Sequence, residues 1–282
     1  MALENMVNML KKAAAEGTAV GAFNILDYNS MRAVLKAAEE VKTPVIVQTS
    51  TATVKFWGVK AIAGWMRELA DKSLGPAALH LDHCKDMELI RQCIEGGWTS
   101  VMIDASSKPL AENIALTKEV VAMAHPVGIS VEGEIGRIGG VEDALVVKTK
   151  DANLADPAEA EQFCQQTGID CLAPAVGTAH GFYKETPQIA FDRIEKIAKR
   201  TALPLALHGG TGLSDDTFRR CIRSGCAKIN VSTHIKHAFI CGFADYYGEH
   251  SKENDPLKVI NAQYERIKSE VARFMAVFKN ND

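Results

Sequence analysis

The sequence predicts an α/β fold, a (β/α)8 TIM barrel with an N-terminal helix and extra C-terminal helices. Eight short runs rich in β-branched residues recur along the 282 residues, and helix-period segments separate them. Strict alternation of strand and helix indicates parallel strands joined by crossover helices. No G-x-G-x-x-G motif opens a helix after the first strand, so the main sign of a dinucleotide-binding sheet is absent. Such barrels commonly use roughly 200 to 250 residues as one domain, so we expect residues 1–282 to form a single domain.

The expected elements follow one another in the order that a barrel requires. A helix within residues 1–17, with Leu, Met and Val at helical spacing, precedes the first strand and is placed to close the bottom of the barrel. The eight expected strands are residues 19–23, 44–48, 77–82, 100–103, 129–134, 171–176, 204–208 and 227–231. Amphipathic helical stretches occupy residues 30–41, 86–95, 109–124, 157–167, 191–199 and 215–223.

Two regions fall outside this alternation. Residues 136–155 are polar and irregular, which is typical of an extended loop after the fifth strand. Residues 234–250 and 256–278 are helical in pattern and exceed what is needed to close a barrel. We expect these C-terminal helices to serve a subunit contact in a homodimer or homotetramer.

Composition excludes several classes of protein. Acidic residues outnumber Lys and Arg by 35 − 32 = 3, and there is no Lys/Arg block, so we expect no nucleic-acid partner. No stretch approaches the roughly 18 apolar residues of a membrane span, and the N-terminus lacks the continuous apolar core of a signal peptide. Seven Cys residues without a C-x-x-C pair, among apolar neighbours, indicate buried reduced thiols. These observations predict a cytoplasmic protein with no membrane partner.

Three histidines follow three different expected strands, at the end where this type of barrel carries its reactive groups. They are His83, His180 and His208. Zinc takes neutral imidazole, and catalytic zinc sites use three protein ligands with one position open for substrate. A single histidine there would more often be a hydrogen-bonded structural residue, but three at one end favour a metal site. His80, deeper in the third strand, is expected to be a core residue or to support a ligand.

Carboxylates gather at the same end of the expected barrel. Asp82 adjoins His83, so it is placed either to exchange a proton with a substrate hydroxyl or only to orient a ligand. Asp104 and Glu134 end the fourth and fifth strands and are expected to orient ligands or to hold a second metal position. Glu142 lies within residues 136–155, where it would either close over substrate or belong to a solvated charged loop.

Glycine-rich or hydroxyl-rich turns follow the seventh and eighth strands, at residues 208–212 and 230–233, and each precedes a helix. Backbone N–H groups at such helix starts hold phosphate, and these two loops are the usual phosphate site of this barrel. The candidate substrate-binding residues are therefore Gly209, Gly210, Thr211, Asn230, Val231, Ser232 and Thr233, to which Gly181 and Lys184 would add an N–H group and a cation.

Six motifs occur in order along nearly the whole chain. They are AFN at 22–24, HLDH at 80–83, EGEIGRIGGVED at 132–143, GTAHGFY at 177–183, LHGGTGL at 207–213 and KINVST at 228–233. Together they closely resemble the class II, metal-dependent ketose-bisphosphate aldolases, which include fructose-bisphosphate and tagatose-bisphosphate aldolases. The combination of motifs is specific, and it implies an aldehyde-lyase on a (β/α)8 barrel.

The resemblance also implies a role for each matching residue. It implies that His83, His180 and His208 bind one catalytic Zn²⁺, that Asp82 is the acid/base at the C4 hydroxyl, and that Glu142 handles the proton of dihydroxyacetone phosphate. The residues that it implies for the phosphate and the dihydroxyacetone body are Gly181, Lys184, Gly209, Thr211, Asn230, Ser232 and Thr233. Asn24 and Asp104 would be supporting polar residues. A monovalent cation, Na⁺ or K⁺, would lie near the carbonyls of Gly181 and Gly209.

One departure from the family pattern concerns the distal end of the substrate. Family members that act on bisphosphates often read Asp-Pro-Arg after the last barrel helix, and that Arg reaches a neighbouring subunit's site, whereas this chain reads Asp255-Pro256-Leu257. Ser50 remains as a distal contact, but the bidentate anion grip of Arg is absent. Fructose or tagatose 1,6-bisphosphate is the default substrate. Substrates with another distal anion, such as 6-deoxy-6-sulfofructose 1-phosphate or 5-dehydro-2-deoxygluconate 6-phosphate, stay open.

Other hypotheses stand beside the aldolase. A metal-dependent phosphosugar epimerase or isomerase would use the same barrel, metal and phosphate site. A non-catalytic partner subunit of an aldolase is a further alternative, and the intact carboxylates and histidines argue against it. A class I aldolase needs a Lys at a strand end for its Schiff base. The end of the sixth strand has none, and Lys228 begins the eighth strand, at the wrong end.

Overall fold

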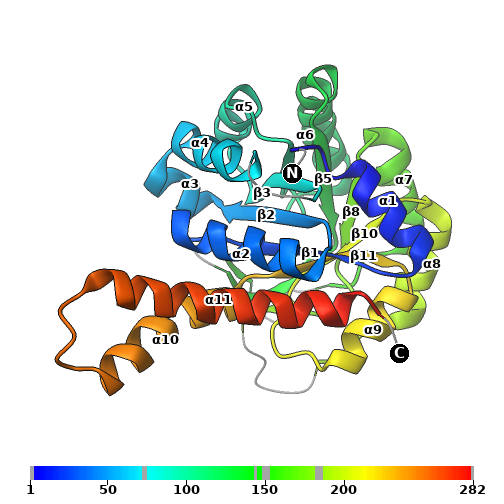
Figure 1. The fold of residues 1–282 in the computed structure, drawn as a ribbon. Coiled ribbons are helices and arrows are strands. Elements are labelled where there is room, and N and C mark those ends of the chain that lie inside the picture. The colour runs from blue at the N-terminus through cyan, green and yellow to red at the C-terminus, as the bar shows by residue number, and fades with distance from the viewer. Residues whose placement is uncertain (1–2, 72–74, 143–144, 148–152, 182–186, 281–282) are drawn as a thin grey trace.

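The predicted barrel is confirmed by a computed structural model, which describes residues 3–71, 75–142, 145–147, 153–181 and 187–280. Eight strands close into a barrel in the order β1-β11-β10-β8-β5-β4-β3-β2, and each neighbouring pair is parallel. The barrel strands are β1 (Val20–Asn24), β2 (Val45–Ser50), β3 (Ala77–Cys84), β4 (Ser100–Ile103), β5 (Ser130–Ile135), β8 (Cys171–Pro174), β10 (Leu205–Leu207) and β11 (Cys226–Val231). The helices form the outer ring (Figure 1).

The helical stretches expected from the sequence are present, and two further helices lie between β2 and β3. They are α1 (Val7–Glu16), α2 (Tyr28–Val41), α3 (Thr51–Trp57), α4 (Val59–Ala70), α5 (Met87–Glu95), α6 (Leu110–Ala124), α7 (Pro157–Thr167), α8 (Phe191–Thr201), α9 (Asp215–Arg223), α10 (Thr233–Glu249) and α11 (Pro256–Phe278), with a 3-10 turn at His125–Val127. Side chains of Asp86, Asp156 and Ser214 accept hydrogen bonds from backbone N–H groups at the starts of α5, α7 and α9, which fixes where these helices begin. No helix was assigned from the sequence to the segment that forms α3 and α4.

Helix α1 closes the amino end of the barrel, as expected. Met6, Met9 and Leu10 are buried against apolar side chains that point into the barrel. Side chains two positions apart on a strand share a face. In β1, β2 and β3, an apolar residue of this layer is followed two positions later by a polar residue on the same face. These pairs are Ala22 and Asn24, Ile46 and Gln48, and Ala78 and His80. The barrel interior is therefore apolar near α1 and polar toward the carboxyl ends of the strands.

The prediction of an extended loop at residues 136–155 was wrong in part, because some of these residues form a hairpin. Strands β6 (Gly139–Glu142) and β7 (Leu145–Val147) pair antiparallel, and β6 also pairs in parallel with β9 (Ala179–His180). Short apolar, β-branched runs such as Leu145–Val147 satisfy their backbone hydrogen bonds best as strands. The hairpin thereby lies against the strand that carries His180.

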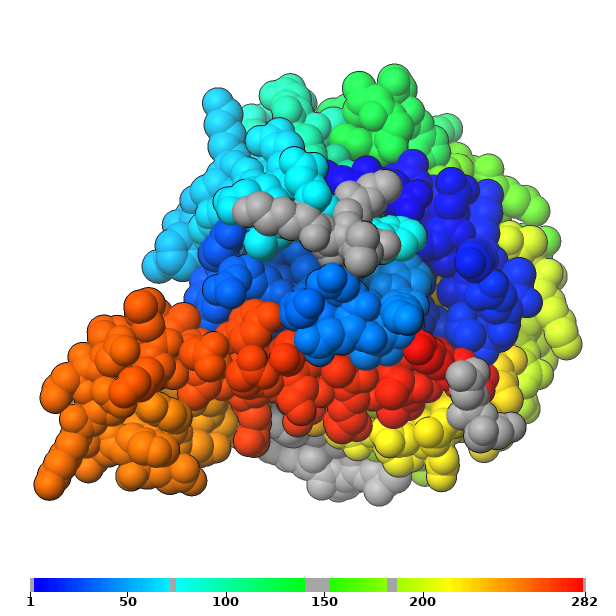
Figure 2. Space-filling model, viewed as in Figure 1, coloured from blue at the N-terminus to red at the C-terminus, as the bar shows by residue number. Residues whose placement is uncertain are grey.

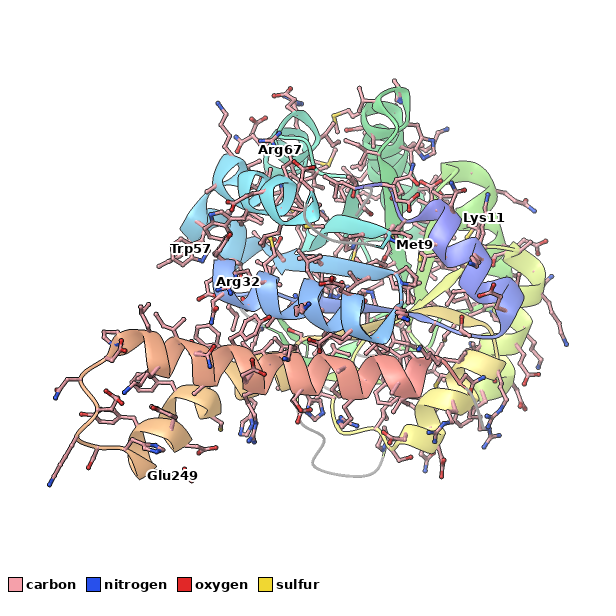
Figure 3. All side chains as sticks on the ribbon, in the orientation of Figure 1. Met9, Lys11, Arg32, Trp57, Arg67 and Glu249 are labelled. Atoms are coloured by element: carbon pink, nitrogen blue, oxygen red, sulfur yellow. The ribbon has the colours of Figure 1, made fainter. Side chains whose placement is uncertain are left out.

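The two C-terminal helices form an arm. Helix α11 packs along α2 and against α10, and Figure 2 shows α10 and the adjoining part of α11 protruding from the body of the molecule. Trp57 lies at the edge of the barrel above this arm, and Glu249 lies near its far end (Figure 3). The exposed large apolar residues on the arm are Ile240, Phe243, Tyr247, Leu257 and Ile260. The extra C-terminal helices are therefore present, and they leave an apolar face uncovered within this chain.

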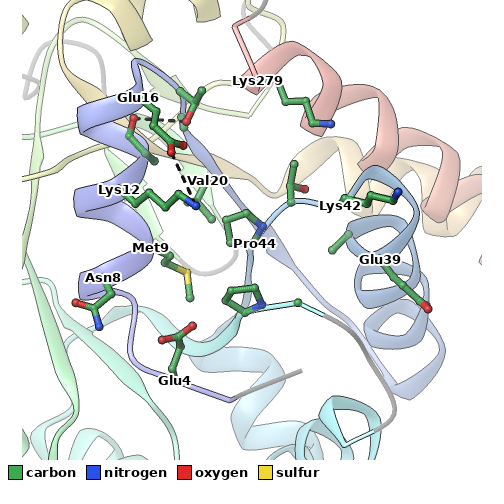
Figure 4. A pocket seen from close by; sticks show the side chains of 17 residues that line it. Glu4, Asn8, Met9, Lys12, Glu16, Val20, Glu39, Lys42, Pro44 and Lys279 are labelled. Atoms are coloured by element: carbon green, nitrogen blue, oxygen red, sulfur yellow. Dashed lines mark hydrogen bonds and ion pairs between the residues drawn. The ribbon is translucent and has the colours of Figure 1, made fainter.

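A cavity of about 700 Å³ lies at the amino end of the barrel, beside α1 (Figure 4). Lys12, Glu16, Lys42 and Lys279 stand around it. Reactive groups of this fold stand at the opposite, carboxyl end of the strands, so we assign no catalytic role to this cavity. Among the described residues, none of the helices combines the length and apolar character needed to cross a membrane.

Candidate active site

The three histidines singled out from the sequence lie together at the carboxyl end of the barrel. His83 comes from β3, His180 from β9, and His208 directly follows β10. Ring nitrogens of the three lie within 4.8 Å of one another, and His208 Nδ1 lies 2.7 Å from His83 Nε2. All three imidazoles are thus close enough to share one metal ion.

The backbone at His83 adopts a conformation that brings its ring into this cluster. His83 has a φ of 47°, in the left-handed region that residues with a Cβ rarely adopt. The pairing of β3 with β4 shifts register between Leu81 and Cys84, around this residue. Bulges of this kind re-aim side chains next to active sites. Local strain at His83 is consistent with a functional position rather than a structural one.

A second group of possible metal ligands shares His83. His83 Nδ1 lies 3.6 Å from Asp104 Oδ2 and 3.7 Å from Glu134 Oε2, and the three form a second donor set. Burial, reinforced by the charge of Asp104, raises the pKa of Glu134 to about 8. Burial would raise the pKa of Asp104 as well, but His83 and the Lys85 ammonium lower it below its usual range. Of these two neighbouring carboxyl groups, Asp104 is the one that ionises more readily.

Glu132 contacts the ring nitrogen of His208 that faces away from His83. His208 Nε2 lies 2.8 Å from Glu132 Oε1, so the Nε2–H group donates a hydrogen bond to the carboxylate and Nδ1 faces His83. Burial lowers the pKa of His208, which favours the neutral imidazole that metals bind. Burial opposes ionisation of Glu132, but the Lys228 charge and the hydrogen bond from His208 hold its pKa well below the usual range.

Asp82 is held by three side-chain amides. Asn24 Nδ2 and Gln48 Nε2 each lie 3.2 Å from Asp82 Oδ2, and Asn230 Nδ2 lies 3.2 Å from Oδ1. Gln48 Nε2 also donates to Asn24 Oδ1 at 2.6 Å. The Asp82 side chain is 1% exposed. These donors fix the carboxylate of the residue that precedes His83 in one orientation, as a positioned acid/base requires.

The expected phosphate-binding turns lie at the same end of the barrel. Gly209 has a φ of 68°, and a Cβ there would come within 2.7 Å of the Ala179 backbone, so only glycine allows this approach of the turn to β9. Thr211 is buried beside it. A Cβ on Gly210 would lie 2.8 Å from the Phe218 ring, so this glycine lets the turn pack on α9.

The turn after β11 leads directly into α10. Asn230 and Val231 end the strand, Ser232 precedes the helix, and Thr233 is its first residue. The Ser232 side chain makes no capping hydrogen bond, and its buried Oγ has no hydrogen-bond partner among the described residues. This leaves a buried hydroxyl at the start of a 17-residue helix, a position that favours an anion.

The remaining predicted residues are placed less completely. Ser50 ends β2 at the same end of the barrel, where its hydroxyl accepts a hydrogen bond from the Thr53 N–H group. Gly181, with a φ of 84°, directly follows β9. Glu142 is the last residue of β6, but the described structure does not extend to its side chain. Lys184 lies outside the described residues.

Three residues at the site were not identified from the sequence. Gln48 and Glu132 each stand two positions from another inward-facing polar residue on their strand, and this spacing is the signal that could have found them. Lys228 was considered only as a Schiff-base lysine, and it was expected at the wrong end of the eighth strand for that role; the structure shows that its Nζ lies 2.9 Å from Glu132 Oε2. Its long side chain reaches toward the site from two positions before Asn230. His80 is fully buried and donates to or accepts from Ser100 at 2.7 Å, as expected of a core residue.

Comparison with known proteins identifies the family. A family model for class II fructose-bisphosphate aldolases matches residues 4–282. The chain belongs to the class II fructose-bisphosphate aldolase family. It is therefore an aldehyde-lyase with a phosphosugar substrate, and class II aldolases are in general zinc-dependent.

Relatives of this aldolase match it over nearly their whole length. The fructose-bisphosphate aldolase of Geobacillus stearothermophilus is 41% identical, with 99% of this chain and 97% of that protein covered. The probable fructose-bisphosphate aldolase of Bacillus subtilis (strain 168) is 40% identical, with 100% and 99% covered. Among solved structures, the YdjI aldolase of Escherichia coli K12 superposes with a TM-score of 0.87 at 30% identity, with 98% of this chain and 97% of that chain covered.

The residues of this aldolase fit the zinc that the family uses. Three imidazoles form a donor set of the type found in catalytic zinc sites, with a position left for substrate. Glu134 Oε2 is buried without a hydrogen-bond partner among the described residues, and it lies 3.8 Å from His208 Nδ1. An unsatisfied buried carboxylate oxygen beside a histidine cluster is accounted for by a cation at this position.

Proposed function

We propose that this aldolase binds one catalytic Zn²⁺ through His83, His180 and His208 and cleaves a ketose 1-phosphate reversibly. The products are dihydroxyacetone phosphate and an aldehyde. The observation that carries the proposal is the convergence of the three imidazoles within 4.8 Å of one another, beside a carboxylate held by three amides. Fructose or tagatose 1,6-bisphosphate is the default substrate, and the names of the relatives support fructose 1,6-bisphosphate.

Asp104 and Glu134 are proposed to orient the ligands or to provide a second metal position. Their shared contact with His83 supports this role. We also propose a monovalent cation, Na⁺ or K⁺, near the carbonyls of Gly181 and Gly209, on the strength of the family resemblance and the positive φ of both residues.

The substrate is proposed to lie across the turns at the carboxyl end of the barrel. One phosphate would be bound by the backbone and hydroxyl groups of the two turns, with Lys184 as a counter-charge. The residues assigned to this phosphate and the dihydroxyacetone body are Gly181, Lys184, Gly209, Gly210, Thr211, Asn230, Val231, Ser232 and Thr233. Asn24 supports Asp82, and Ser50 would face the distal end of the substrate.

Cleavage of the C3–C4 bond leaves an electron pair that must be accommodated and a hydroxyl proton that must be removed. Zinc, when bound, would supply Lewis-acid stabilisation of the charge that develops on the C2 oxygen. Asp82 accepts the proton of the C4 hydroxyl as the aldehyde departs. Glu142 then donates a proton to C3 of the remaining fragment, which gives dihydroxyacetone phosphate, and it removes that proton in the reverse direction. The same residues run the reverse, condensation reaction.

Three alternatives remain as outcomes of the test. An aldolase for 6-deoxy-6-sulfofructose 1-phosphate or 5-dehydro-2-deoxygluconate 6-phosphate would keep the metal and exchange only the distal contacts. A phosphosugar epimerase or isomerase would use the same site without releasing a triose phosphate. A non-catalytic partner subunit would do neither.

We further propose that residues 1–282 act as one cytoplasmic barrel domain that assembles into a homodimer or homotetramer. The exposed apolar residues of the α10–α11 arm support a subunit contact, because apolar patches of this kind mark interfaces. The described helices include none that spans a membrane, and the sequence carries no block of basic residues for nucleic acid.

A coupled dehydrogenase assay for triose phosphate, run with several ketose phosphates, tests the proposal. EDTA should abolish triose phosphate release, and Zn²⁺ or Co²⁺ should restore it. His180→Ala should lose both zinc and activity, whereas His250→Ala, at an exposed histidine at the end of α10, should keep both. Full activity in a demonstrably metal-free preparation would refute the proposal. Inactivation by borohydride in the presence of substrate would refute it as well, because that treatment traps a Schiff base.

A further inference from the structure

Lys228 is a charged side chain inside the barrel, and the mechanism above does not use it. Its exposed fraction is 0%. The Nζ atom lies 2.9 Å from Glu132 Oε2 and 2.7 Å from Asn230 Oδ1. Burying an ammonium group is costly, and a buried ion pair is often replaceable by apolar residues without loss of stability. Stability alone therefore does not explain a lysine here, and its two contacts lead to two different parts of the site.

The first contact leads to the metal cluster. Glu132 uses Oε2 for Lys228 and Oε1 for His208 Nε2, at 2.8 Å. A carboxylate only accepts, so Nε2 of His208 carries the proton and Nδ1 presents its lone pair to the cluster. Fixing Glu132 therefore fixes both the tautomer and the ring orientation of His208.

The second contact leads to the acid/base. An ammonium group only donates, so the Asn230 atom that faces Lys228 must be the amide oxygen. The Nδ2 group is thereby turned toward Asp82 Oδ1, at 3.2 Å. Without the lysine, the Asn230 amide would lose the cation that holds its oxygen away from the Asp82 carboxylate.

The barrel topology makes this connection a long-range one. Lys228 lies on β11 and Glu132 on β5, and β10 and β8 stand between these strands in the barrel. The ammonium therefore crosses the barrel interior instead of joining neighbouring strands. The backbone of Lys228 stands two positions before Asn230 on β11, so the side chain reaches both contacts from within the barrel.

We propose that Lys228 is a positioning residue that holds the zinc ligand His208 and the acid/base Asp82 in a fixed mutual arrangement, through Glu132 on one side and Asn230 on the other. This inference rests on the proposed function for the roles of His208 and Asp82. Removing the ammonium should lower two properties, each through a different contact. They are the affinity of the apoprotein for zinc, through Glu132, and the turnover number at saturating zinc, through Asn230.

Lys228→Met tests the inference, because it removes the charge and keeps most of the apolar stem. Zinc affinity of the apoprotein, measured by competition with a chromogenic chelator, should fall by about 10- to 100-fold, the usual effect of losing a group behind a metal ligand. The kcat at saturating zinc should fall by about tenfold or more. Lys228→Arg, which keeps a buried cation, should recover part of both losses.

A second variant distinguishes loss of positioning from a folding defect. Lys228→Met leaves Glu132 as an unpaired buried charge, so Lys228→Met/Glu132→Gln removes both charges together. This double variant should fold and still show the lower kcat. Met66→Ala is the matched control: Met66 is fully buried in α4, away from the site, so its loss lowers the melting temperature and leaves zinc affinity and kcat unchanged.

Three outcomes would contradict either the inference about Lys228 or the proposed function. Zinc affinity and kcat within twofold of the parent in a folded Lys228→Met or double variant overturn the inference. Failure of both variants to fold, with Met66→Ala folded, also overturns it, because Lys228 would then serve stability. A parent that binds zinc but releases no triose phosphate from any ketose phosphate refutes the proposed function instead, and the zinc measurement still tests the contact through Glu132.

Discussion

The side-chain amide of Asn230 lies 3.2 Å from the Asp82 carboxylate, although 148 residues separate the two in the chain. Both residues stand near the carboxyl ends of barrel strands, Asp82 in β3 and Asn230 in β11. Closing the barrel is what brings them together, because β1 and β2 alone separate β11 from β3 in the strand order. The fold thus assembles the surroundings of the Asp82 carboxylate, the proposed acid/base, from distant segments.

Asp82→Ala should lower turnover by about a hundredfold or more, the usual effect of removing a positioned acid/base. Zinc content should stay near that of the parent, because Asp82 belongs to neither of the donor sets that the histidines form. Steady-state kinetics and metal analysis of the same preparation provide the measurement. Asp86→Ala is the control, since Asp86 only caps α5 and pairs with Lys55. A variant that loses zinc and regains its rate in excess zinc would make Asp82 an orienting group.

Gln48→Leu should lower kcat by about tenfold, because the Asp82 carboxylate loses one of its three amide donors and such a hydrogen bond to a charged group contributes roughly 1.5 kcal/mol. Thr49→Val is a matched control. Thr49 is the next residue on β2 and is fully buried, and its hydroxyl has no hydrogen-bond partner within the described part of the chain. Equal kcat values for the two variants would contradict the assigned role of Gln48.

The thiols of this aldolase should be almost inert in the native state. Six of the seven cysteines are buried, and burial raises the pKa of each of these thiols, which disfavours the reactive thiolate. Titration with Ellman's reagent should therefore detect no more than one thiol per chain in native protein and seven in guanidinium chloride. Cys241→Ser should abolish the native reaction. Two or more native thiols would show that the core opens more readily than its packing suggests.

The barrel and its three clustered histidines could be predicted because local sequence patterns indicate both. Strand and helix periods alternate along the chain, and a histidine at the end of a strand is visible without knowledge of its partners. His83, His180 and His208 therefore needed only the assumption of a closed barrel to be placed together.

Residues inside the strands could not be assigned in the same way. Gln48, Glu132 and Lys228 face inward only because of the strand register, and a buried lysine runs against the ordinary preference of this residue for solvent. The hairpin at residues 139–147 was missed for a related reason. Its pairing with β9 joins segments about 40 residues apart, as Gly139 opposite Ala179 illustrates. Local periodicity cannot indicate a partner that is so distant in the sequence.

Our expectation about the distal end of the substrate rests on Leu257. It is 72% exposed in the first turn of α11, on the protruding arm, where Asp255 accepts a hydrogen bond from its backbone N–H group. Neighbouring Lys258 is paired with Glu253 at 2.8 Å, so it does not replace a guanidinium at this position. If the family's Arg reaches a neighbouring subunit's site, this chain presents an apolar side chain there.

We therefore expect Leu257→Arg to raise kcat/KM for fructose 1,6-bisphosphate by about tenfold or more, because a guanidinium on a phosphate contributes roughly 1.5 to 3 kcal/mol. The parent should bind the bisphosphate poorly, or hold it through a Lys or Arg elsewhere. The measurement compares kcat/KM for the bisphosphate with that for a sulfonate- or carboxylate-bearing analogue in both proteins. Phe243→Arg, which adds a cation at an exposed position on α10, should give no gain. A parent that already prefers the bisphosphate strongly, with no improvement from the introduced Arg, would mean that the distal site is complete and that Leu257 carries no information about the substrate.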